Sequence, residues 1–69
     1  MELKLVNSSN LHMIGYDSEE QVLRVMFKNG TIYDYQNVPP AMYQALTLAA
    51  SKGVFFSRFI KNKFLFTRA

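Results

Sequence analysis

The sequence predicts an α+β fold: a three-stranded antiparallel β-meander followed by two α-helices, with a possible short fourth strand at the C-terminus. Three observations predict it. Residues 11–36 alternate with period two and are rich in β-branched and aromatic residues. Turn-forming residues, Asn29-Gly30 among them, interrupt this alternation. After Pro39-Pro40 the pattern becomes helical.

We expect the strands at about residues 11–16, 21–28 and 31–36. The connections between them are short, whereas a parallel pairing needs a crossover of about a dozen residues or more. The meander is therefore antiparallel.

A proline pair marks the change from strand to helix. Pro39 and Pro40 cannot sit in a central strand, but a proline fits the first turn of a helix, where its missing amide hydrogen has no partner to lose. The good helix formers that follow predict a helix over about residues 40–50, with Met42 and Leu46 on its apolar side.

The hydroxyl of Ser51 is suited to cap a second helix. A rotation of about 100° per residue separates an apolar arc, expected to be core, from a basic arc facing water: Phe55, Phe56, Phe59 and Ile60 against Arg58 and Lys61. The alternation in the last residues, KFLFTRA, predicts either a short edge strand or an extended tail laid over the sheet.

Two tyrosines, Tyr33 and Tyr35, follow the Asn29-Gly30 turn one residue apart, and their face depends on the hairpin register. A two-residue type I′ loop would place both rings on the face of Arg24 and Lys28. That arrangement would make them a platform for stacking nucleobases.

A type I turn with Gly30 in a left-handed bulge gives the other register. Leu23 then lies opposite Tyr35, and Val25 opposite Tyr33, so the tyrosines join an apolar inner face. We favour this register because it also sets Arg24 opposite Asp34, and opposite charges that face each other across two strands stabilise the sheet. In this register alone, the apolar inner face and the charged outer face are consistent with each other.

The charge is unevenly distributed along the 69 residues, whose net charge is +3. Residues 1–36 contain all five acids and three basic residues, a net charge of −2, whereas residues 37–69 contain five basic residues and no acid. A surface of one sign attracts polyanions or acidic proteins, although a merely solvated helix face is the alternative.

Composition excludes several classes of protein. The absence of cysteine excludes a disulfide framework and thiolate chemistry, and no apolar run reaches the roughly 18 residues that span a bilayer. We expect a soluble, cytoplasmic protein of one domain over residues 1–69, a monomer or weak homodimer from a bacterium or phage, without membrane contact. Exposure of Met26 and Ile32 would favour dimerisation or cover by the C-terminal tail.

The order of several motifs resembles the KTSC domain, a small domain found at the C-terminus of some lysyl-tRNA synthetases and as stand-alone bacterial and phage proteins. The resemblance extends from about residue 8 to Arg68 and rests on these segments: Ser8-Ser9-Asn10, Ile14-Gly15-Tyr16-Asp17, Asn29-Gly30, Tyr33-x-Tyr35, Val38-Pro39 and Ala50-Ser51-Lys52-Gly53. It implies a domain of unknown function for which RNA binding has been suggested. The C-terminal tail departs from the arginine-rich tails of many members, which weakens any phosphate contact assigned to it. The family motif residues Tyr33, Tyr35, Ser51 and Gly53 are expected to be structural.

No catalytic or metal-binding pattern is present. His12 is the only histidine, and strict alternation would place it beside Ile14 and Tyr16. Ser8 and Ser9 suit a turn, while Ser51-Lys52-Gly53 at a helix start is at most a small anion site. We also expect little room for a pocket of roughly 300 Å³ or more. The sequence therefore predicts no enzyme, no cofactor and no metal.

The predicted function is a non-catalytic binding module that associates with RNA or another nucleic acid through the basic half. Its candidate binding residues are Lys52, Arg58, Lys61, Lys63 and Arg68. The alternative is a protein-interaction or assembly module whose basic surface meets an acidic partner.

Overall fold

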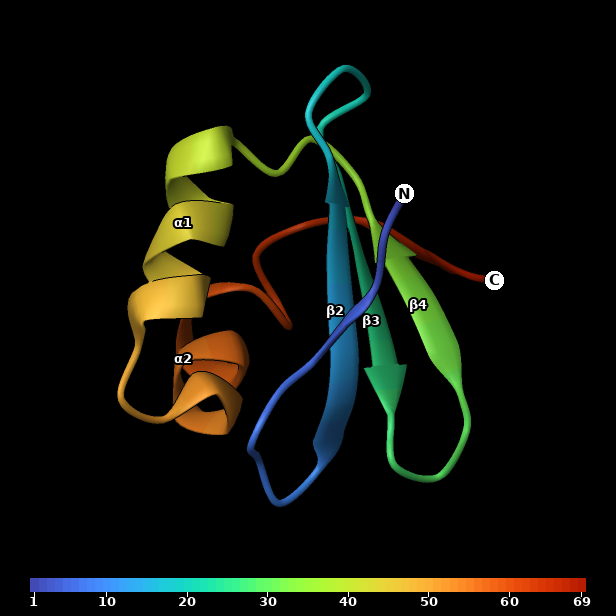
Figure 1. Ribbon diagram of the computed structural model, residues 1–69. Coiled ribbons are helices and arrows are strands. Elements are labelled where there is room, and N and C mark those ends of the chain that lie inside the picture. Colours follow the sequence, from blue (N-terminus) through green and yellow to red (C-terminus); the bar gives the residue numbers. More distant parts are fainter.

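The computed structural model describes residues 1–69 and has two layers, a sheet with two helices on one of its faces (Figure 1). The strands are β1 (Lys4–Leu5), β2 (Leu11–Asp17), β3 (Val22–Phe27), β4 (Ile32–Tyr35) and β5 (Phe66–Arg68), and the helices are α1 (Pro40–Leu48) and α2 (Lys52–Phe59). The sheet is antiparallel, with strand order β1-β2-β3-β4-β5. The α+β meander with two helices is confirmed, and the tail forms the edge strand β5. The two-residue strand β1 was not expected.

The β3–β4 hairpin adopts the bulged register. Leu23 pairs with Tyr35, and Val25 with Tyr33. The amide of Gly30 donates to the carbonyl of Phe27 at 2.9 Å, and Gly30 has a φ of 92°, a left-handed value that favours glycine. The tyrosines therefore face the helices, as the second alternative predicts.

The same register joins Arg24 and Asp34 on the outer face of the sheet. Nε and Nη2 of Arg24 donate to the two carboxylate oxygens of Asp34 at 2.7 and 2.8 Å. This two-bond contact with the guanidinium lowers the pKa of Asp34, while partial burial acts in the opposite direction. The pair fixes β3 against β4 from the solvent side.

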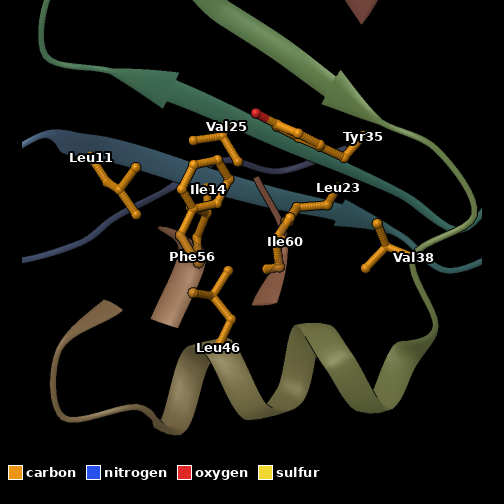
Figure 2. Close-up of a cluster of buried hydrophobic side chains, with 9 residues drawn as sticks. All are labelled: Leu11, Ile14, Leu23, Val25, Tyr35, Val38, Leu46, Phe56 and Ile60. Atoms are coloured by element: carbon orange, nitrogen blue, oxygen red, sulfur yellow. The ribbon is translucent and has the colours of Figure 1, made fainter. Parts of the chain in front are cut away.

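The core lies between the inner face of the sheet and the helices (Figure 2). Leu46 enters it from α1, and Phe56 and Ile60 enter from α2 and the residue that ends it. The sheet and the β4–α1 connection supply the rest: Leu11, Ile14, Leu23, Val25, Tyr35 and Val38.

Both helices begin as predicted. Pro40 is the first residue of α1, and the Ser51 hydroxyl caps α2 by accepting from the amide of Val54 at 3.3 Å. The aromatic arc of α2 is only partly core, because Phe55 is half-buried and Phe59 is 47% exposed. The expectation that Phe59 is core is wrong: α2 is short and only one side of it touches the sheet, so Phe59 rests on Phe55, with ring centroids 4.8 Å apart.

The expected position of His12 is also wrong. The β2–β3 register shifts between Leu11 and Met13, which interrupts strict alternation at this point. Leu11 and Ile14 are both buried although they are three residues apart, and His12 is exposed. An irregularity of one residue is enough to turn His12 away from the face of Ile14.

The N-terminal residues cross the outer face of the sheet at Gly15. A Cβ atom on Gly15 would lie 2.7 Å from Cδ2 of Leu3 and 2.8 Å from the carbonyl oxygen of Glu2. Glycine is thus required by the close approach of another segment of chain. Met26 and Ile32, on the same face, are half-buried within the single chain, which removes the argument for dimerisation that their exposure would have supplied.

Tyr16 links the sheet to the start of α1. Its hydroxyl donates to the carbonyl of Val38, and its ring stacks on Tyr43 of α1, with centroids 4.7 Å apart and an interplanar angle of 8°. Burial, followed by the nearby charge of Asp17, raises the pKa of Tyr16. The neutral, donating form of the side chain is therefore favoured in the folded protein.

Replacing Asp34 with Asn is expected to destabilise the protein at pH 7 by about 0.2–1 kcal/mol, the range for cross-strand charge pairs. Because folding lowers the pKa of Asp34, the wild-type advantage is present above the ordinary pKa of 3.8 and is lost as pH falls through the lower pKa of the folded state. Urea unfolding of both proteins at pH 7 and about pH 2 measures this. A difference that stays constant across this range would contradict it.

Replacing Tyr16 with Phe is expected to cost roughly 1–3 kcal/mol, because the carbonyl of Val38 loses its donor while the ring stack remains. Tyr43→Phe is the matched control, since it keeps the same stack and removes a hydroxyl that makes no hydrogen bond within the chain. Chemical denaturation of the two variants compares them. Equal losses would show that the Val38 contact contributes nothing.

Candidate functional site

The fold separates the charges between the two ends of the sheet. The β2–β3 turn, which follows the strand residue Asp17 and contains Glu19 and Glu20, lies at the top of Figure 1. The β3–β4 turn, with Lys28, lies at the bottom, on the same side as residues 7–10 and α2. Consecutive turns of a meander fall at opposite ends, so the acidic cluster is held away from Lys28 and α2.

Two hollows open at the lower end. The polar hollow, of about 770 Å³, lies between residues 7–10 and α2. The aromatic hollow, of about 370 Å³, lies between the β3–β4 hairpin, the residues after α2 and β5. The amide of Lys28 donates to the carbonyl of Asn10 at 2.9 Å, and this bond ties together the two loops that border them. The expectation that the chain has little room for a pocket of this size is wrong.

The polar hollow is formed by a loop resting directly on the start of α2. Oγ of Ser8 accepts from the amide of Leu11 at 3.3 Å and donates to Oδ1 of Asn10 at 3.2 Å. A Cβ atom on Gly53 would lie 3.0 Å from each of those two side-chain oxygens, so glycine permits the contact. The lining is mostly polar: Asn7, Ser8, Ser9, Asn10, Ala50, Ser51, Gly53, Val54, Ser57 and Arg58. Arg58 is its one charged residue.

The aromatic hollow is lined by both aromatic rings and polar groups. The Phe66 ring lies 5.1 Å from that of Tyr33 and 5.3 Å from that of Tyr35, between centroids. Oδ1 of Asn29 accepts from the amide and the hydroxyl of Thr31 at 3.0 and 2.7 Å. The lining residues are Phe27, Asn29, Thr31, Tyr33, Tyr35, Lys61, Asn62 and Phe66.

The two tyrosines differ in their roles. Tyr35 is 3% exposed, and its ring lies 5.4 Å from Phe56 in the core. Burial raises the pKa of Tyr35, with a smaller contribution from Tyr33. Tyr33 is half-buried, contacts Phe27 edge to face at 5.7 Å and forms part of the wall of the aromatic hollow. The Tyr-x-Tyr motif therefore supplies a core residue and a surface residue from the same face.

The five predicted basic residues do not form one cluster. Arg58 lines the polar hollow and Lys61 lines the aromatic hollow, three residues further along the chain. Arg68 pairs with Tyr33 across β4 and β5, so it emerges on the same sheet face as the aromatic hollow. Lys63 is exposed after α2, whereas Nζ of Lys52 donates to the carbonyl of Ala49 at 3.2 Å.

Lys28 is a basic residue that the division of the chain into acidic and basic halves hid. It belongs by sequence to the acidic half, yet the β3–β4 turn places it at the end that carries both hollows. The meander predicts this placement of Lys28, because the turn that follows the acidic β2–β3 turn lies at the opposite end of the sheet. None of the five acids lines either hollow.

The remaining chemical candidates are placed as follows. No group of three His, Cys, Asp or Glu residues is arranged to hold a metal ion. Ser51 and Gly53 line the polar hollow, while the Lys52 side chain does not. No helix combines the length and the apolar character that crossing a membrane requires.

Comparisons with known proteins agree on the family. The family model of the KTSC domain matches residues 7–64. An uncharacterized protein of Stutzerimonas stutzeri is 43% identical over 61 residues, covering 88% of this chain and 86% of that protein. A lysine–tRNA ligase of Nostoc punctiforme is 40% identical over 58 residues, which are 84% of this chain but only 10% of the ligase.

A solved structure has the same fold. The crystal structure of a KTSC domain protein from Yersinia pestis superimposes with a TM-score of 0.93 and 38% sequence identity, covering 99% of this chain and 96% of that one. The family match spans the loop at residues 7–10, the Tyr-x-Tyr motif and α2, which are the elements that build both hollows. This chain belongs to the KTSC domain family.

Proposed function

We propose that this protein is a non-catalytic RNA-binding module and that RNA lies across the end of the sheet that carries the two hollows. The observation that carries the proposal is the placement of one cation in each hollow, Arg58 and Lys61, while none of the five acids lines either hollow. Phosphate groups bind cations on such surfaces irrespective of sequence. The binding strength would come mainly from these contacts.

Arg58 and Lys61 suit a strand that follows the surface from one hollow to the other. Arg58 lies in the last turn of α2 and Lys61 follows the end of that helix, while Lys28 stands in the β3–β4 turn, where its amide is bonded to the loop at residues 7–10. Arg68 extends the basic surface beside Tyr33. Of the five basic residues of the C-terminal half, Lys52 contributes least in this proposal, because its ammonium group is already bound to a carbonyl.

The relatives support RNA over other polyanions. Among them are segments of lysine–tRNA ligases, enzymes whose name describes the attachment of lysine to tRNA. A domain added to such an enzyme has RNA close by. We accordingly propose that the protein acts in the cytoplasm, where tRNA is charged.

The proposal excludes a catalytic role. The exposed His12 lies on β2 and lines neither hollow, and no carboxylate is present in either hollow to exchange a proton. What the hollows offer is hydroxyls, amides, rings and two cations. These groups recognise a ligand and leave it unchanged.

RNA binding is expected to depend steeply on salt and on Arg58 and Lys61. Fluorescence anisotropy at about 50 mM salt, with tRNA and with a labelled single strand, measures the affinity. Replacing either residue with Gln is expected to weaken binding and to reduce the slope of log K against log salt by roughly 0.7 for a single strand. Lys4→Gln is the matched control, since Lys4 is exposed on β1 at the other edge of the sheet.

Absence of RNA binding at about 50 mM salt would contradict the proposal, as would an equal loss in Lys4→Gln. Capture from lysate of one acidic protein partner, unaffected by nuclease, would favour the alternative of a protein-interaction module. In that case the same cations would still be required, but the nucleic acid would not.

A further inference from the structure

We propose that the aromatic hollow is a subsite for one unpaired nucleobase of the bound RNA. The inference rests on the proposed function and names the part of the RNA that enters one of the two hollows. Proteins that bind single strands combine rings that stack on bases with cations that hold the backbone. The residues that line the aromatic hollow include both aromatic rings and a cation, Lys61.

The rings of the aromatic hollow contact one another. Phe66 contacts both Tyr33 and Tyr35, at centroid distances of 5.1 and 5.3 Å, yet 51% of its surface remains exposed. Tyr33 is held from its other side by Phe27. Because the side chains are fixed by one another, a flat ring that enters the hollow loses less affinity to the ordering of the protein.

The polar residues that line the aromatic hollow suit the edge of a base. The side-chain oxygen of Asn29 already accepts two hydrogen bonds from Thr31. The two side-chain amide hydrogens of Asn29 are left for an acceptor outside the chain. Asn62 lines the hollow as an exposed carboxamide able to donate and accept. Carboxamides read the hydrogen-bonding edges of bases that are splayed out of a helix.

The positive charges beside the aromatic hollow favour binding of a nucleotide over binding of an uncharged aromatic ligand. Lys61 lines the hollow, and Arg68 emerges on the same face next to Tyr33. No acid lines it. A base among the rings would place its 5′ or 3′ phosphate within the field of these two cations, whereas an aromatic side chain of a protein would bring no such charge.

The test compares a single-stranded RNA octamer with the same octamer carrying abasic riboses at its central positions. The backbone charge is equal, so only base recognition separates them. We expect the wild-type protein to bind the base-bearing strand at least about fivefold more tightly, the lower end of the stacking range. Anisotropy at one fixed salt concentration gives the ratio.

Phe66→Leu is expected to remove most of this ratio, because it keeps an apolar side chain on β5 and deletes the aromatic ring. Phe59→Leu is the matched control: Phe59 is similarly exposed, at 47% against 51%, but lies outside both hollows. Asn62→Ala in the exposed turn should reduce the ratio without touching the core. With the unmutated protein, nuclear Overhauser contacts between the Phe66 ring and base protons should appear.

The outcomes separate the two proposals. Equal binding of the base-bearing and abasic strands would overturn the subsite and leave the RNA-binding module intact. An unchanged ratio in Phe66→Leu, or base contacts that fall only on other residues, would overturn it as well. Failure of both strands to bind would overturn the RNA-binding module, and the subsite with it.

Discussion

The register of the β3–β4 hairpin is the constraint on which the rest of the structure depends. Gly30 in the left-handed region adds one residue to the turn, and the resulting register decides which side chains of β4 face the helices. With the bulge, Tyr35 enters the core and Tyr33 stands beside it at the surface. A shift by one residue would bury Asp34 and separate it from Arg24. The outer ion pair and the inner aromatic cluster thus stabilise the same register from opposite faces.

A second consequence of the meander is the separation of charge. Turns that follow one another along the chain lie at opposite ends of the sheet, so the acidic β2–β3 turn is remote from the loop at residues 7–10 and from α2 (Figure 1). A net charge of +3 is modest for 69 residues. Concentrated at one end, however, the same charge produces a local positive field that the total conceals.

Much of the fold could be predicted from the sequence because short-range patterns and long-range strand pairing agree. The Asn-Gly turn allows two registers, but the alternation of Leu23 and Val25 and the complementary Arg24 and Asp34 favour one of them, and the structure has it. The cap at Ser51 was predicted from its hydroxyl and the helix that follows.

What could not be predicted depends on contacts between distant segments or on irregular backbone. The bulge at Leu11–Met13 moves His12 without a glycine to signal it, and β1 depends on the pairing of Lys4 with Ile14 and of Leu5 with Met13. The exposure of Phe59 follows from the limited contact of α2 with the sheet. The hollows arise between segments that are distant in the sequence, so no pattern along the chain predicts them. Lys28 became a candidate only once those loops were placed.

The central claim is that RNA binds one end of this sheet and avoids the other. Backbone amide chemical shifts of the isotope-labelled protein, followed during a titration with single-stranded RNA, test it most directly. We expect the large changes at residues 7–10, in the turn at residues 28–31 and over the C-terminal part of α2 and the residues that follow it. Changes concentrated at the β2–β3 turn, or on the outer face around Arg24 and Asp34, would contradict the account.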